Sequence, residues 1–206
     1  MSVGLWIWSH VSFVVLVMAI LCSLIRRQHS ALTRTLCCCT IVGLAILPIQ
    51  QLDLSGLMLG HIGILSASTM VLLLQTLSSQ LVMTERLSDS EDRMLNWGWF
   101  LVGSVIYTST FGFIDQDFYA LGYQTQMSWF VLAASAIAAV LRHWLLAMCL
   151  VTAILAHQWR LCESANLWDC LIDPWLFLAS AFQLLLSAIR RISLHQTTVA
   201  QTQQIV

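Results

Sequence analysis

Seven long apolar runs, separated by short polar segments, constrain the fold of this chain more than any other feature. A run of about 20 apolar residues matches the ~30 Å hydrocarbon core of a bilayer. Hydrophobic residues fill 59% of the 206 positions and charged residues 9%, whereas roughly a quarter of an ordinary soluble domain is charged. The sequence therefore predicts an all-α fold, a polytopic transmembrane helical bundle of about seven spans.

The apolar runs define the expected helices and a single transmembrane domain over residues 1–192. An uninterrupted helix over 127–158 would be ~48 Å long at 1.5 Å per residue, so the polar pair Arg142-His143 is expected to divide it. Residues 193–206 are expected to form a polar C-terminal tail. The predicted spans are 5–25, 36–52, 57–77, 97–114, 127–141, 144–158 and 174–189.

The arginines predict the orientation of this bundle. The chain has nine basic residues, all of them arginine, and the absence of lysine excludes a retinal protein, which needs a Schiff-base lysine. With seven crossings and the N-terminus outside, eight arginines lie in cytoplasmic segments and only Arg160 lies outside. This positive-inside bias predicts an external N-terminus, a cytoplasmic C-terminus and a multi-pass protein of the bacterial inner membrane.

A group of histidines and carboxylates is predicted to lie near the outer face. Imidazole with carboxylate suits a divalent transition metal, and the same groups could relay protons or bind a cationic solute. Their dispersed spacing equally allows loop carboxylates and histidines that hydrogen-bond between helices. Small neighbours, Gly60 and Gly63, favour His61 as the centre of a site. The candidate ligand-binding residues are His10, Asp53, His61, Asp115, Asp117, His157 and Asp169; the metal and any cofactor are unknown.

Two further features lie in the segment before the last apolar run. Cys162 and Cys170 are both expected outside, where oxidising conditions would allow a disulfide. Asp173 precedes Pro174, and this pair is typical of a helix N-terminus, with the aspartate as N-cap. Trp168 and Asp169 could instead form a docking point for a partner.

The sequence contains no CxxC, HExxH, GxSxG or phosphate-binding glycine motif, so it favours a non-enzymatic protein. The leading hypothesis is an accessory or assembly subunit of a membrane complex. A transporter or facilitator for a small solute or metal ion is the second, and a membrane enzyme or cofactor-binding protein is the third. The expected partners are membrane lipids and other membrane subunits or further copies of the chain. Nucleic acid is not expected.

Overall fold

The computed structural model describes residues 3–24, 63–81 and 88–203, with a few isolated positions between residues 36 and 53. Side chains in 192–203 lie outside this description. The described residues are almost entirely helical. In chain order the elements are α1 (Val3–Leu24), β1 (Pro48–Ile49), β2 (Leu52–Asp53), α4 (Ala67–Leu81), α5 (Asp89–Thr110), η1 (Tyr119–Tyr123), α6 (Thr125–Val140), α7 (Trp144–Gln158), α8 (Leu167–Leu171) and α9 (Pro174–Gln203).

Local sequence signals explain where α4 and α5 begin. The Ser66 hydroxyl accepts a hydrogen bond from the Thr69 amide at 3.2 Å, which is an N-cap, so α4 begins at Ala67 rather than near residue 57. Ser88 and Glu91 form a reciprocal capping box at the start of α5. Each cap satisfies amides that have no partner inside the helix.

Positive backbone φ angles accompany two of the breaks between helices. Arg142 has φ 64°, a left-handed conformation that stops α6 and lets α7 start at Trp144. Gly112 has φ 75°, which glycine adopts without a Cβ penalty, and it follows the end of α5 at Thr110. The apolar run 97–114, which is expected to be helical, therefore lies in α5. This helix begins at Asp89, before the run, and ends at Thr110, four residues before the run ends.

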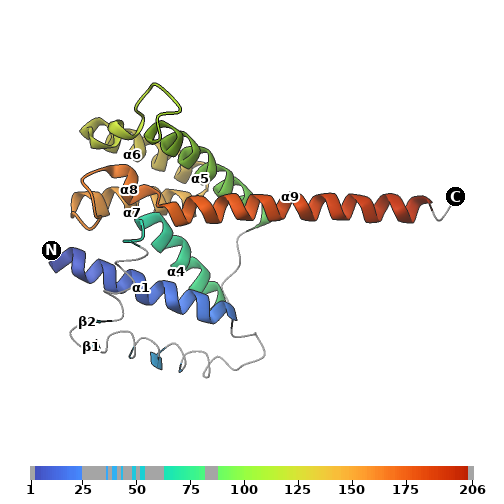
Figure 1. Ribbon diagram of the computed structural model, residues 1–206, viewed down its shortest axis with the longest axis horizontal. Helices are drawn as coiled ribbons and strands as arrows, with labels where there is room; N and C mark the ends of the chain where they lie inside the picture. Colours follow the sequence, from blue (N-terminus) through green and yellow to red (C-terminus); the bar gives the residue numbers. More distant parts are fainter. Residues whose placement is uncertain are drawn as a thin grey trace.

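The helices pack in two neighbouring groups (Figure 1). Helix α1 lies along α4, α4 packs on α7, and α7 pairs with α6, while α5 and α9 form a second pair. Figure 1 shows α9 extending well past the other helices toward the C-terminus. One buried cluster joins α5, α6, α7, α8 and the start of α9, and a smaller one joins α1 to α4.

A short antiparallel ladder replaces the end of one expected helix. Pro48 pairs with Asp53, and Ile49 pairs with Leu52, inside and just beyond the range predicted as the span 36–52. Pro48 carries no amide hydrogen to donate and fixes its own φ, which disfavours a continuous helix here. Most of the predicted span lies outside the described residues.

The prediction of a membrane-spanning bundle is corrected by the structure. Across the described ranges, none of the helices combines the length and the apolar character that a membrane crossing requires. The polytopic transmembrane fold class, with its seven spans and its external N-terminus and cytoplasmic C-terminus, is therefore wrong for this part of the chain. The helical part of the expectation remains, because nearly every described element is a helix.

Helix length and polar content account for the correction. Helices α6 and α7 have 16 and 15 residues, which is about 24 and 22 Å of rise against a ~30 Å hydrocarbon core. The last two turns of α4 contain Gln75, Thr76 and Gln80. The first turn of α5 is charged, and Arg190 and Arg191 interrupt the apolar sequence of α9, although the helix continues through them. Helix α1 is longer, but Ser9, His10 and Ser12 occupy its N-terminal half.

Candidate functional site

Hydrogen bonds around Asp169 hold one end of the molecule together. We call this group, Asp169 with Tyr119, Ser164 and Asn166, the Asp169 cluster. The Tyr119 hydroxyl donates to the Asp169 carboxylate, 2.9 Å from Oδ2 and 3.1 Å from Oδ1. The Ser164 hydroxyl donates to the same carboxylate. Tyr119 belongs to η1 and Asp169 to α8, so the carboxylate joins segments 50 residues apart.

Asn166 extends this Asp169 cluster into the core. Its side chain is fully buried: Nδ2 donates to the Tyr119 carbonyl at 3.0 Å, and Oδ1 accepts from the Trp168 amide at 2.9 Å as the N-cap of α8. The Trp168 indole donates to the Phe118 carbonyl at 3.0 Å. Asn166 packs directly against Gly122, where an added Cβ would lie 1.8 Å from Oδ1.

A disulfide closes the segment that carries Asn166 and Asp169. Cys162 and Cys170 are bonded, with their Cα atoms 5.6 Å apart, a separation that suits a disulfide. Both are buried, 9% and 0% exposed. The bond and the Asp169 cluster together fix the connection between α7 and α9.

Two tyrosines near the carboxylates of Asp169 and Asp173 are disfavoured as anions. Burial raises the pKa of Tyr107 to about 12, and the negative charges of Asp173 and Asp169 add to the effect. Burial also raises the pKa of Tyr119, as do its hydrogen bond to Asp169 and that residue's charge. A phenol that donates to a carboxylate keeps its proton, so Tyr119 acts here as a hydrogen-bond donor.

A second buried carboxylate, Asp173, joins the N-termini of α4 and α9. Its Oδ2 accepts from the Ser66 amide at 2.8 Å and from the Thr69 hydroxyl at 2.6 Å. Its Oδ1 accepts from the Leu176 amide at 2.7 Å, which confirms the predicted capping role. Asp173 is 5% exposed, and these three bonds compensate for the loss of its hydration.

The outer surface of the α6–α7 hairpin is unusually apolar. The residues that this hairpin buries are mostly small, including Ser135, Ala138, Ala147, Cys149 and Ala153. The large side chains face outward instead, and their exposed fractions reach 70% at Phe130 and 82% at Val140. We call this surface the α6–α7 face. Its exposed large residues are Trp129, Phe130, Leu132, Ile137, Val140, Leu141, Trp144, Met148, Val151, Leu155 and Trp159.

No family model, curated protein or solved structure matches this chain. The features of the molecule that bear on its function are the Asp169 cluster, the exposed apolar surface and the Asp173 joint, which consists of Asp173 and its donors Ser66, Thr69 and Leu176. The two carboxylates make structural hydrogen bonds to tyrosine, serine, threonine and amide donors, the pattern of groups that hold a fold together.

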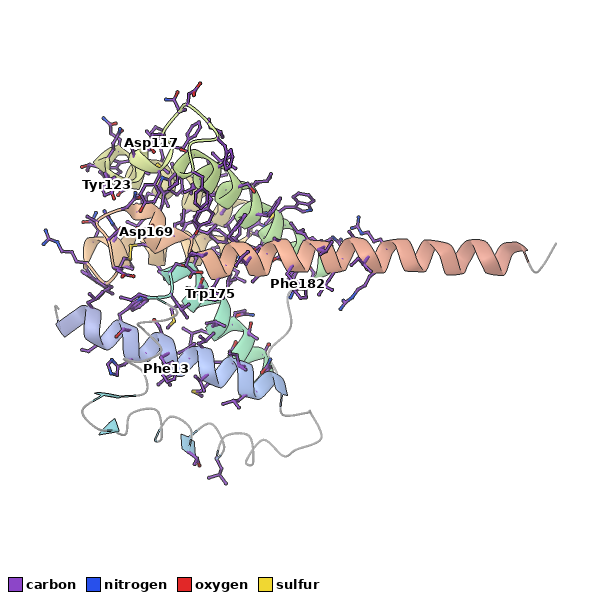
Figure 2. The ribbon with its side chains drawn as sticks, in the orientation of Figure 1. Phe13, Asp117, Tyr123, Asp169, Trp175 and Phe182 are labelled. Carbon is purple, nitrogen blue, oxygen red and sulfur yellow. A yellow bond between two sulfur atoms is a disulfide. The ribbon has the colours of Figure 1, made fainter. Side chains whose placement is uncertain are left out.

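The predicted site residues that the structure describes lie on different elements. His10 lies on α1, where its Nδ1 is 3.3 Å from the Ser9 hydroxyl, and His157 lies in the last turn of α7. Asp115 and Asp117 are exposed on the loop between α5 and η1, and Asp117 accepts from the Ala120 amide at 3.0 Å. Figure 2 shows Asp117 on this projecting loop, away from Asp169.

The structure does not describe the side chains of the two remaining predicted residues. His61 lies outside the described residues, and of Asp53 only the backbone in β2 is described. In the part of the chain that the structure covers, no three histidine, cysteine or acidic side chains are grouped so that they could hold a metal. A shared ligand site that includes His61 stays a prediction.

The buried cysteine of α7 has the environment of a packing residue. Cys149 is fully buried, and its thiol lies 3.9 Å from the Ser68 carbonyl. Burial raises the pKa of this thiol to about 12. Because the thiolate is the nucleophilic and metal-binding form, Cys149 packs α7 against α4 and is not poised for covalent chemistry.

Several residues of these clusters were not anticipated from the sequence. Asn166 had a readable signal, because an asparagine before a short apolar helix favours N-capping. Tyr119, Thr69 and Gly122 had none for their contacts with Asp169, Asp173 and Asn166, since these residues lie 44 or more positions away in the chain.

Proposed function

We propose that this protein is a non-enzymatic accessory subunit, which works by packing its apolar faces against the helices of partner subunits in a larger assembly. The observation that carries the proposal is the inverted packing of the α6–α7 hairpin. Its small side chains face the interior and its aromatic and branched side chains face outward. Monomeric proteins rarely expose contiguous apolar patches of more than a few hundred Å².

The composition of the face supports a protein partner. Trp129, Trp144 and Trp159 lie at the ends of the two helices, and Phe130 lies beside the first. Tryptophan and other aromatic residues are enriched in the buried centres of interfaces, where they supply most of the binding energy. Ile137, Leu141 and Met148 add aliphatic surface between them.

The rigid end of the molecule supports the same function. The Asp169 cluster, the disulfide and the Ser135 hydroxyl, which donates to the Ala147 carbonyl at 3.1 Å, hold α6, α7 and α8 in a defined relation. A preorganised surface loses less entropy on association. These buried polar groups therefore hold the α6–α7 face in one geometry before a partner binds.

The test is isolation of the tagged protein from its native cells in a mild neutral detergent. The proposal predicts a second polypeptide at fixed stoichiometry. It further predicts loss of that polypeptide when Phe130 and Ile137 are both changed to Ser. A matched control, Thr125→Ala with Gln126→Ala, changes exposed polar residues of the same helix and should retain the partner. Isolation of a lone chain covered only by lipid or detergent would contradict the proposal, and so would isolation of copies of this chain alone.

A further inference from the structure

A groove of about 860 Å³ lies between the two helix groups, away from the α6–α7 face. Its lining comes from α1, α4, the first turns of α5 and one side of α9. Helices α4 and α9 meet at the Asp173 joint and diverge from it (Figure 1). The volume is in the range of sites that enclose small organic ligands, roughly 300–1,000 Å³.

One wall and the floor of this groove are apolar. Leu72 and Leu73 of α4, Leu16 and Ile20 of α1, and Leu176 of α9 all contribute to the lining. The lining of α9 runs from Trp175 to Arg191, so the groove extends along about 24 Å of this helix at 1.5 Å per residue. Its shape and lining suit an extended hydrocarbon chain.

The far end of the groove is basic. Among the described lining residues, Arg93 of α5 and Arg190 and Arg191 of α9 lie here together with one acidic residue, Asp92. Three guanidinium groups and one carboxylate leave a net charge of +2 at this end. Guanidinium groups bind carboxylate and phosphate oxygens through paired hydrogen bonds.

The lining of the groove also includes a buried hydroxyl. Ser180 of α9 is 1% exposed, and among the described residues its Oγ has no hydrogen-bond partner. Leaving a buried hydroxyl without a partner is costly, and native proteins rarely do so. Gln183 and Ser187 continue this polar stripe along α9 toward the arginines.

We infer that this groove binds a single-chain amphiphile with an anionic headgroup, a long-chain carboxylate or monoacyl phosphate. The headgroup lies against Arg93, Arg190 and Arg191, and the chain lies along Leu72, Leu73 and Leu176. The inference does not depend on the proposed interaction with partner subunits, because the groove and the α6–α7 face share no residue.

The inference is tested by competition with a fluorescent long-chain fatty acid bound to the full-length protein in a neutral detergent. Hexadecanoate and a monoacyl phosphate are expected to displace it at one site per chain. Hexadecanol, octanoate and inorganic phosphate are expected to displace it poorly, because each lacks either the charge or the chain. Equal competition by hexadecanol would show burial of hydrocarbon alone, and competition by phosphate would show an ion site alone; either result overturns the inference.

Variants separate the groove from the other apolar surfaces. Arg190→Gln with Arg191→Gln changes exposed side chains and should weaken hexadecanoate binding by about tenfold or more, since charge-assisted hydrogen bonds are lost. Ala179→Trp introduces an indole from an exposed lining position and should block the site. Ile137→Ser, on the α6–α7 face, should leave binding unchanged. Unaltered affinity in both groove variants would overturn the inference.

Discussion

The Asp173 carboxylate accepts a hydrogen bond of 2.6 Å from the hydroxyl of Thr69, a residue 104 positions earlier in the chain. This bond joins the first turn of α4 to the first turn of α9, and the amides of Ser66 and Leu176 complete the coordination of the carboxylate. The two helices diverge from this point, so the bond fixes the closed end of the groove between them.

Asp173→Ala is expected to destabilise the protein by about 3 kcal/mol, because it removes a helix cap and leaves buried donors without an acceptor. Asp173→Asn should cost less, since the amide oxygen replaces one carboxylate oxygen. Chemical unfolding followed by circular dichroism measures both. Asp115→Ala, on the exposed loop, should change stability by no more than about 0.5 kcal/mol. Equal effects of the alanine variants at positions 173 and 115 would show that the joint is not a stabilising contact.

Gly122→Ala should cost about 2 kcal/mol, the usual scale for overpacking. Its Cβ would lie 1.8 Å from Asn166 Oδ1 and 2.6 Å from Trp168, and both side chains are held by hydrogen bonds. Gly98→Ala is the matched control: it lies inside α5 with no heavy atom within 4 Å of an added Cβ. That change should stabilise the protein by up to about 1 kcal/mol. Thermal melting curves of the two variants should therefore shift in opposite directions.

Reduction of the Cys162–Cys170 bond should destabilise the folded state by roughly 2.5 kcal/mol, from loss of the closed loop. The measurement is a melting curve with and without a reductant. A variant with both residues changed to Ala should melt at a reduced temperature and should no longer respond to the reductant. If the wild-type melting temperature is insensitive to reduction, the disulfide contributes nothing to stability.

Stability should fall in alkaline solution because of Tyr107. Its pKa is about 12 in the folded protein and about 10 in an unfolded chain. The unfolded state therefore releases the phenolic proton first, and stability present below pH 10 is lost as pH rises toward 12. Tyr107→Phe should flatten this decline in the free energy of unfolding. An unchanged slope in that variant would contradict the assignment, which tyrosinate absorbance can check independently.

Signals that are local in the sequence predict part of this fold, and contacts between distant residues are not predicted. The apolar runs located most helices, and the pair Arg142-His143 lies at the turn between α6 and α7 because a left-handed residue stops the first helix there. Asp173 could be read as a cap because the signal is local. Its bonds to Ser66 and Thr69 could not be read, because they depend on how distant helices meet.

The apolar runs also led to the largest error. Apolar composition predicts membrane-spanning helices, but the length of an apolar run in the sequence is not the length of a helix in the fold. Helix α4 starts only at Ala67, where Ser66 caps it, and α5 begins with charged residues. The large side chains of α6 and α7 face outward instead, and the proposed function assigns this apolar surface to contacts with partner subunits.

Site-specific photo-crosslinking in native cells tests the proposed subunit role most directly. A photoreactive residue placed at Ile137 or Met148, which face outward, is compared with one at Asp115 on the exposed loop. We expect one discrete crosslinked polypeptide from positions 137 and 148, and none from position 115. Crosslinks to lipid alone, or the same products from all three positions, would contradict the proposal that a partner subunit covers this face.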